Sequence, residues 1–85
     1  MVIDNETTNR AIESYIKDVR SAMNINSVFL FGSYAKDNFH EHSDIDLCFF
    51  LNDFEGRDSL ETMKELFYMT HKYKGFDIQP TFFLT

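Results

Sequence analysis

The sequence is poor in several residue types, and each shortage narrows what the protein can be. Its 85 residues include one cysteine, Cys48, so no internal disulfide can form, which fits a reducing cytoplasm. The longest apolar runs, residues 28–31 and 47–51, are far too short to span a membrane. Residues 1–10 are polar and acidic and lack the apolar core of a secretory signal. We expect a cytoplasmic protein without a membrane partner.

Basic residues are also scarce, with 8 Lys and Arg against 14 Asp and Glu and a net charge of −6. An acidic surface repels polynucleotides, so we expect no nucleic acid polymer as partner, although metal ions can still bridge carboxylates to a nucleotide. The hydrophobic fraction of 44% and ten phenylalanines suffice for a core. We therefore predict a single domain over residues 1–85, small enough to depend on a partner protein or on homo-oligomerisation.

Hydrophobic periodicity predicts two long amphipathic helices, one short helix and three short strands. The predicted fold class is α+β, a small mixed three-stranded sheet flanked by helices in the order α-β-α-β-α-β. The elements are expected at residues 7–23, 27–31, 33–39, 44–51, 58–74 and 76–84.

The second long helix begins at Asp58, where an Asp followed by Glu61 is typical of an N-terminal capping box. Gly75 suits the position after the last helical turn. The apolar residues at helical spacing are expected to face the core, and they are Leu60, Met63, Leu66, Phe67 and Thr70.

The strands carry their own burial signals. Residues 47–51 are continuously apolar, which predicts that both faces of the second strand are covered, with Cys48 buried as an inert thiol. Pro80 cannot donate a hydrogen bond to a neighbouring strand, so the third strand is expected at an edge of the sheet or bulged at that point.

Chemistry-bearing residues gather around the first two strands. Gly32 and Ser33 end the first strand, and about ten residues later Asp44-Ile45-Asp46 opens the second. Carboxylates at i and i+2 of a strand point to the same face, and aspartate is unfavourable in strands, so the pair indicates a divalent cation. Gly32 allows close backbone approach and Ser33 offers a hydroxyl, which both suit a phosphate.

Connectivity brings a third acid to this place. A strand–helix–strand crossover makes the second and third strands parallel, so their first residues lie side by side. Asp77, at the start of the third strand, is therefore expected near Asp44 and Asp46. The end of the first strand is expected at the same edge of the sheet.

The motif from Phe31-Gly32-Ser33 to Asp44-Ile45-Asp46 resembles the signature of the polymerase-beta-like nucleotidyltransferase superfamily. In the spacing of this motif and in its short length, the chain is most similar to the minimal nucleotidyltransferases. Some of these proteins are antitoxins of HEPN-domain toxins. The resemblance implies the nucleotidyltransferase fold and transfer of a nucleoside monophosphate to a hydroxyl, with AMP from ATP, or another NTP, as donor. It also implies two Mg²⁺ ions.

Residue roles follow from the same resemblance. Asp44, Asp46 and Asp77 would carry catalysis. Asp44 and Asp46 would bind both metal ions and the triphosphate, and Asp77 would bind the catalytic metal ion and help to deprotonate the acceptor hydroxyl. Gly32 and Ser33 would hold the β and γ phosphates, and Lys36 would add positive charge there.

Three further readings of the sequence concern the acceptor and the activity. The chain ends just after the third strand, so we expect the acceptor site to lie on another chain. The resemblance implies that this other chain is a HEPN toxin. A small molecule such as an aminoglycoside is the alternative acceptor. A catalytically weak or inactive fold acting as a binding antitoxin or scaffold is a different possibility. The loop favours it, because antitoxin members carry Gly-Ser-Arg-Ala-Arg-Gly where this chain has Gly32-Ser33-Tyr34-Ala35-Lys36-Asp37. The third possible function is that of a non-catalytic acidic domain that binds Ca²⁺ or Mg²⁺.

Overall fold

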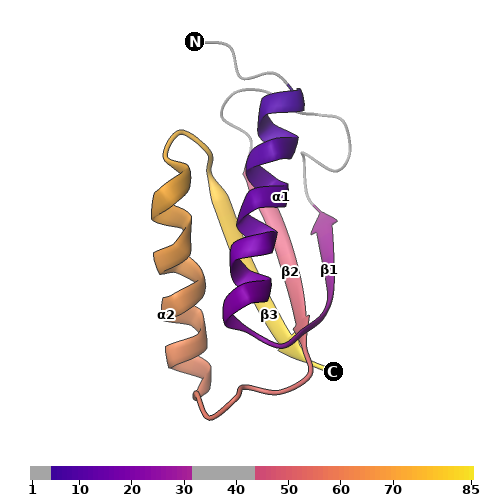
Figure 1. The fold of residues 1–85 in the computed structure, drawn as a ribbon, viewed down its shortest axis with the longest axis vertical. Coiled ribbons are helices and arrows are strands. Elements are labelled where there is room, and N and C mark those ends of the chain that lie inside the picture. Colours follow the sequence, from indigo (N-terminus) through magenta and orange to yellow (C-terminus); the bar gives the residue numbers. More distant parts are fainter. Residues whose placement is uncertain (1–4, 32–43) are drawn as a thin grey trace.

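The computed structural model describes residues 5–31 and 44–85, and these form two helices and a three-stranded sheet (Figure 1). The predicted α+β class with a mixed sheet is confirmed; the short helix predicted at 33–39 falls outside the described residues. No helix in the described ranges is long and apolar enough to cross a membrane. The elements are α1 (Asn5–Ala22), β1 (Ile25–Phe31), β2 (Ile45–Leu51), α2 (Ser59–Thr70), a 3₁₀ turn (His71–Tyr73) and β3 (Ile78–Leu84).

The sheet has the order β1-β2-β3, with β2 in the centre. β1 runs antiparallel to β2, so that Phe31 at the end of β1 pairs with Asp46 near the start of β2. β2 and β3 are parallel, joined through α2, and Ile45 pairs with Ile78. β3 is an edge strand, as Pro80 predicted. The end of β1 and the beginnings of β2 and β3 therefore lie at one end of the sheet.

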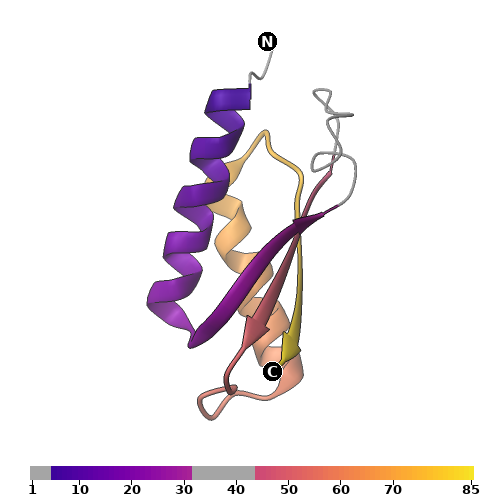
Figure 2. The same ribbon diagram turned by 90° about the vertical axis from the view of Figure 1, so that its right-hand side faces the viewer.

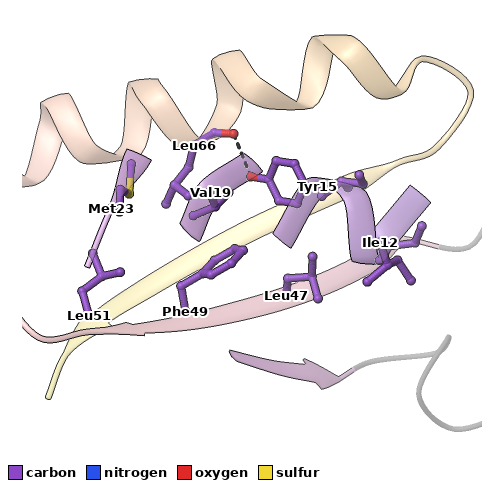
Figure 3. Close-up of a cluster of buried hydrophobic side chains, with 10 residues drawn as sticks. Ile12, Tyr15, Val19, Met23, Leu47, Phe49, Leu51 and Leu66 are labelled. Atoms are coloured by element: carbon purple, nitrogen blue, oxygen red, sulfur yellow. Dashed lines mark hydrogen bonds between the residues drawn. The ribbon is translucent and has the colours of Figure 1, made fainter. Parts of the chain in front are cut away.

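Both helices cover the same face of the sheet, and the hydrophobic core lies between the two layers (Figures 2 and 3). Tyr15 and Val19 of α1 and Leu66 of α2 are fully buried against Leu47 and Phe49 of β2. The Tyr15 hydroxyl donates a hydrogen bond of 2.8 Å to the carbonyl oxygen of Leu66, and its ring packs edge-on against Phe49 at 6.0 Å. These contacts tie the helices to each other and to the central strand.

The prediction that both faces of β2 are covered is wrong for the described part of the chain. Ile45, Leu47, Phe49 and Leu51 face the helices and are buried, but no described element packs on the opposite face. The apolar run on that face reflects the preference of aromatic side chains for strands rather than burial between two layers. Cys48 is nevertheless buried, at 9% exposure, and this burial raises the pKa of its thiol.

Helix α2 begins as predicted but presents a different face to the core. The Asp58 carboxylate caps the helix, accepting a hydrogen bond of 2.8 Å from the backbone N–H of the third residue. Thr62 and Leu66 are buried, whereas Leu60 and Phe67, predicted to be core residues, are 62% and 39% exposed. Thr62 tolerates burial because its hydroxyl donates a hydrogen bond of 2.9 Å to the carbonyl oxygen of Asp58.

Several element boundaries also differ from the prediction, and α1 spans Asn5–Ala22 rather than residues 7–23. β1 begins at Ile25 rather than residue 27, and β3 begins at Ile78, so that Asp77 immediately precedes the strand. α2 ends at Thr70, four residues before the predicted end, because the chain tightens into the 3₁₀ turn. Gly75 follows that turn with φ of +95°, a left-handed conformation that glycine adopts without strain.

Candidate active site

The parallel pairing of β2 and β3 places two acidic residues next to each other. Asp44 and Asp77 each stand one residue before their strands, and the residues that follow them, Ile45 and Ile78, are paired. The backbone N–H of Ile45 donates a hydrogen bond of 2.7 Å to the carbonyl oxygen of Asp77, which fixes the two chain segments at the sheet end. Sequence connectivity therefore predicted this neighbourhood correctly.

The side chains of Asp44 and Asp77 lie close enough to share a hydrogen bond when one of the two carboxyl groups carries a proton. The pKa of Asp44 is raised above its ordinary value, first by the hydrogen bond to Asp77 and by its negative charge, then by desolvation and the charge of Asp46. The pKa of Asp77 is lowered because its carboxylate accepts hydrogen bonds from Asp44 and from Gln79. Ionisation of both carboxyl groups at once is therefore unfavourable unless a cation lies between them.

Asp46 lies on the open face of β2, between Phe31 of β1 and Gln79 of β3. It is partly buried, and its charge acts on Asp44, two residues earlier on the same face. The three acids predicted from the sequence therefore come from two neighbouring strand starts, and the charges of Asp46 and Asp77 both act on Asp44.

Gln79 is the residue at this site that the sequence interpretation missed. Its side-chain Nε2 donates a hydrogen bond of 2.6 Å to Oδ1 of Asp77, two residues earlier. The signal was available, because residues at i and i+2 of a strand share a face. An amide that donates to a carboxylate restricts the rotation of that carboxylate and favours its ionised form.

The donor chemistry of this cluster suits a hard divalent cation, since all three side chains offer carboxylate oxygens, the ligands that Mg²⁺ prefers. A cation between Asp44 and Asp77 would relieve the repulsion between their negative charges. Within residues 5–31 and 44–85, however, no group of three or more His, Cys, Asp and Glu side chains is arranged so that it could hold a metal ion. The paired carboxyls fit a cation, and Asp46 would have to approach them to complete the site.

The predicted phosphate-binding residues, Gly32, Ser33 and Lys36, lie outside the described residues. The last described residue before them, Phe31, pairs directly with Asp46. β1 thus ends beside the acids, as the spacing of the motif predicted.

Residues 11–79, well over half of the chain, match the family described as polymerase beta nucleotidyltransferase. The chain belongs to this family. The matched stretch runs from α1 to the second residue of β3 and contains all three acids. No curated protein and no solved structure matches the chain significantly. The polymerase beta nucleotidyltransferase family gives the chain a general nucleotidyl transfer function.

Proposed function

We propose that this domain is a Mg²⁺-dependent nucleotidyltransferase that moves a nucleoside monophosphate, AMP from ATP, to a hydroxyl group on a partner protein. The observation that carries the proposal is the meeting of Asp44, Asp46 and Asp77 at one end of the sheet, within a stretch that matches a nucleotidyltransferase family. Neighbouring carboxylates that repel each other are typical of a site that binds cations.

Asp44 and Asp46 would hold the metal ions, and Asp77 would join them on the acceptor side. When bound, Mg²⁺ supplies charge neutralisation at the triphosphate and lowers the pKa of an acceptor hydroxyl. The hydroxyl oxygen forms a bond to the α-phosphorus while the bond from the α-phosphorus to the bridging oxygen breaks, and pyrophosphate leaves. Asp77, which Gln79 orients through a hydrogen bond, would receive the hydroxyl proton.

The proposed acceptor is a hydroxyl side chain of a HEPN-type toxin, which would make the domain an antitoxin in the cytoplasm. This part of the proposal is supported by the resemblance of the Gly32-Ser33 and Asp44-x-Asp46 motif to the minimal nucleotidyltransferases. Within that motif, Ser33 and Lys36 would contact the phosphates of the donor.

Two radiolabelled donors test the reaction type. With Mg²⁺ and an extract of cellular proteins as acceptors, label from α-³²P-ATP should become attached to protein, whereas label from γ-³²P-ATP should be released as pyrophosphate. Attachment of the γ label would instead indicate phosphoryl transfer, and the proposal would be wrong.

A matched pair of variants tests the residues. Asp44→Asn combined with Asp46→Asn should reduce the transfer of the α label by at least about 10³-fold, since removal of even one electrostatic stabiliser costs about 10²–10³. Glu13→Gln, an exposed acid on α1, is the control and should leave transfer unchanged. Equal activity of the double variant and the control would contradict the assignment.

A further inference from the structure

The face of the sheet that the helices leave open carries an aromatic patch made of Phe29, Phe31, Phe50 and Phe83. Phe29, Phe31 and Phe83 are 58%, 45% and 54% exposed, and Phe50 is partly buried between them. The Phe50 ring packs edge-on against Phe29 at 5.6 Å and stacks on Phe83 at 5.8 Å. The patch is therefore one connected surface that crosses all three strands.

The aromatic patch is continuous with the acids. Phe31 pairs with Asp46, and Phe50 lies four residues further along β2 on the same face, about 13 Å away at the rise of a strand. A molecule that presents a group to Asp44 and Asp77 over the open face would lie along these phenylalanines. Apolar contact and carboxylate chemistry thus belong to one binding surface.

The charges of the open face are of one sign. Across the described part of the three strands and the residues just before them, this face has acids but no Lys, Arg or His. Its residues are Ser27, Phe29, Phe31, Asp44, Asp46, Cys48, Phe50, Asp77, Gln79, Thr81 and Phe83. Charge complementarity favours an occupant with cationic groups near the acids and apolar groups over the phenylalanines, and disfavours nucleic acid and a second copy of this acidic chain.

We propose that the open face is the docking surface of the acceptor, and that the acceptor is a protein segment with a hydroxyl side chain at the acids, Lys or Arg beside it, and apolar side chains over the aromatic patch. This inference rests on the proposed function and adds the chemistry by which the acceptor is chosen. About half of each exposed phenylalanine is free, so the patch offers about 300 Å² of apolar surface. A stable dimer buries about 800 Å² per partner, so this area fits a transient complex from which a modified acceptor departs.

Binding of fluorescent peptides tests the surface without catalysis. The first peptide combines leucine, lysine and one tyrosine; in the second, serine replaces leucine; in the third, glutamate replaces lysine. In fluorescence anisotropy without nucleotide or metal, only the first should bind. Phe29→Thr and Phe83→Thr should each raise its Kd about tenfold, or about 1.4 kcal/mol. Leu60→Gln, which removes a 62% exposed apolar side chain from α2, is the control and should not change the Kd.

The outcomes separate this inference from the proposed function. The docking surface is supported if the Phe29→Thr variant no longer transfers the α label to the first peptide but its Tm still rises when Mg²⁺ and ATP are added. Three results would overturn the inference, even if transfer occurs. The first peptide does not bind, all three peptides bind equally, or the Kd is the same in the variants and the control. A dimer in sedimentation that Phe29→Thr dissociates would also overturn it, because the occupant would then be a second copy. Binding without any nucleotidyl transfer would leave the surface supported and refute the proposed chemistry.

Discussion

The raised pKa of Asp44 beside Asp77 predicts that Mg²⁺ stabilises this domain more as the pH rises. Metal ligands must be deprotonated, so at low pH the ion has to displace the proton that the pair holds, and at higher pH it does not. If Mg²⁺ and ATP together reach about 100 times their dissociation constant, mass action adds about 2.7 kcal/mol to the free energy of unfolding. For a domain of this size that is an increase in Tm of about 10–20 °C.

For the metal-free protein, the contribution of Asp44 to the free energy of unfolding should instead fall as the pH rises. The pKa of Asp44 is raised in the folded state from its ordinary value of 3.8, so its protonated form contributes stability that is fully present below that value. This contribution is lost as the pH rises through the raised pKa of Asp44. Asp77 has a lowered pKa, so its contribution is present above the ordinary value of 3.8 and is lost only as the pH falls through the lowered pKa. Between about pH 4 and neutrality, the contribution of Asp44 therefore determines how the free energy of unfolding contributed by this pair changes with pH.

Differential scanning fluorimetry from about pH 4 to pH 8, with EDTA or with MgCl₂ and each of the four NTPs, measures both effects. Asp77→Asn should flatten the metal-free slope, because the two largest causes of the raised Asp44 pKa both come from Asp77. The double variant with Asp44→Asn and Asp46→Asn should show no increase in Tm when Mg²⁺ and ATP are added. The reasoning is refuted if the gain is independent of pH, or if that double variant gains as much as the parent.

Three smaller predictions concern the fold and the acids. Tyr15→Phe removes the buried hydrogen bond to Leu66 and should cost about 1 kcal/mol, a fall in Tm of about 4–8 °C, measured by calorimetry; an unchanged Tm would show that the hydroxyl contributes nothing. Asp58→Ala removes the cap of α2 and should cost about 1 kcal/mol in urea unfolding, with the m-value unchanged. Gln79→Leu removes a donor to Asp77, so the pKa of Asp77 should rise toward its ordinary value in a carboxyl NMR titration. No change in that titration would mean that Gln79 does not contact the carboxylate in solution.

The acids could be placed from the sequence because their position depends on chain connectivity. Any helix that joins β2 to β3 as a crossover makes the strands parallel, which brings Asp44 beside Asp77 whatever the packing details. The hydrogen bond between Ile45 and Asp77 is the direct consequence. Gln79 could have been found by the same period-two argument, but a lone glutamine carries no chemical signal until its neighbour is known.

Burial was harder to predict because it depends on which elements pack on which face. The apolar run of β2 has the same composition whether one or two layers cover it, and among the described elements the two helices cover the face of Leu47 and Phe49. In α2, Leu60 and Phe67 are as apolar as Leu66, yet only Leu66 points to the core. Hydrophobicity states what each residue prefers, whereas the contacts between α1, α2 and the sheet decide which preferences are met.

A single irregularity in β1 explains why the aromatic patch and the acids share a face. The pairing with β2 shifts between Ile25 and Ser27, so residue 26 is an extra residue in the ladder. Beyond it, Val28 and Leu30 pair with Phe49 and Leu47 on the helix side. If the ladder ran on from Ile25 without this shift, each later residue of β1 would pair one position further along β2 and change faces, because the side-chain period of a strand is two. Phe29 and Phe31 would then point into the helix layer, and the acids would lose their apolar neighbour. The bulge thus costs one ladder position and sets the surface along which an acceptor would reach the carboxylates.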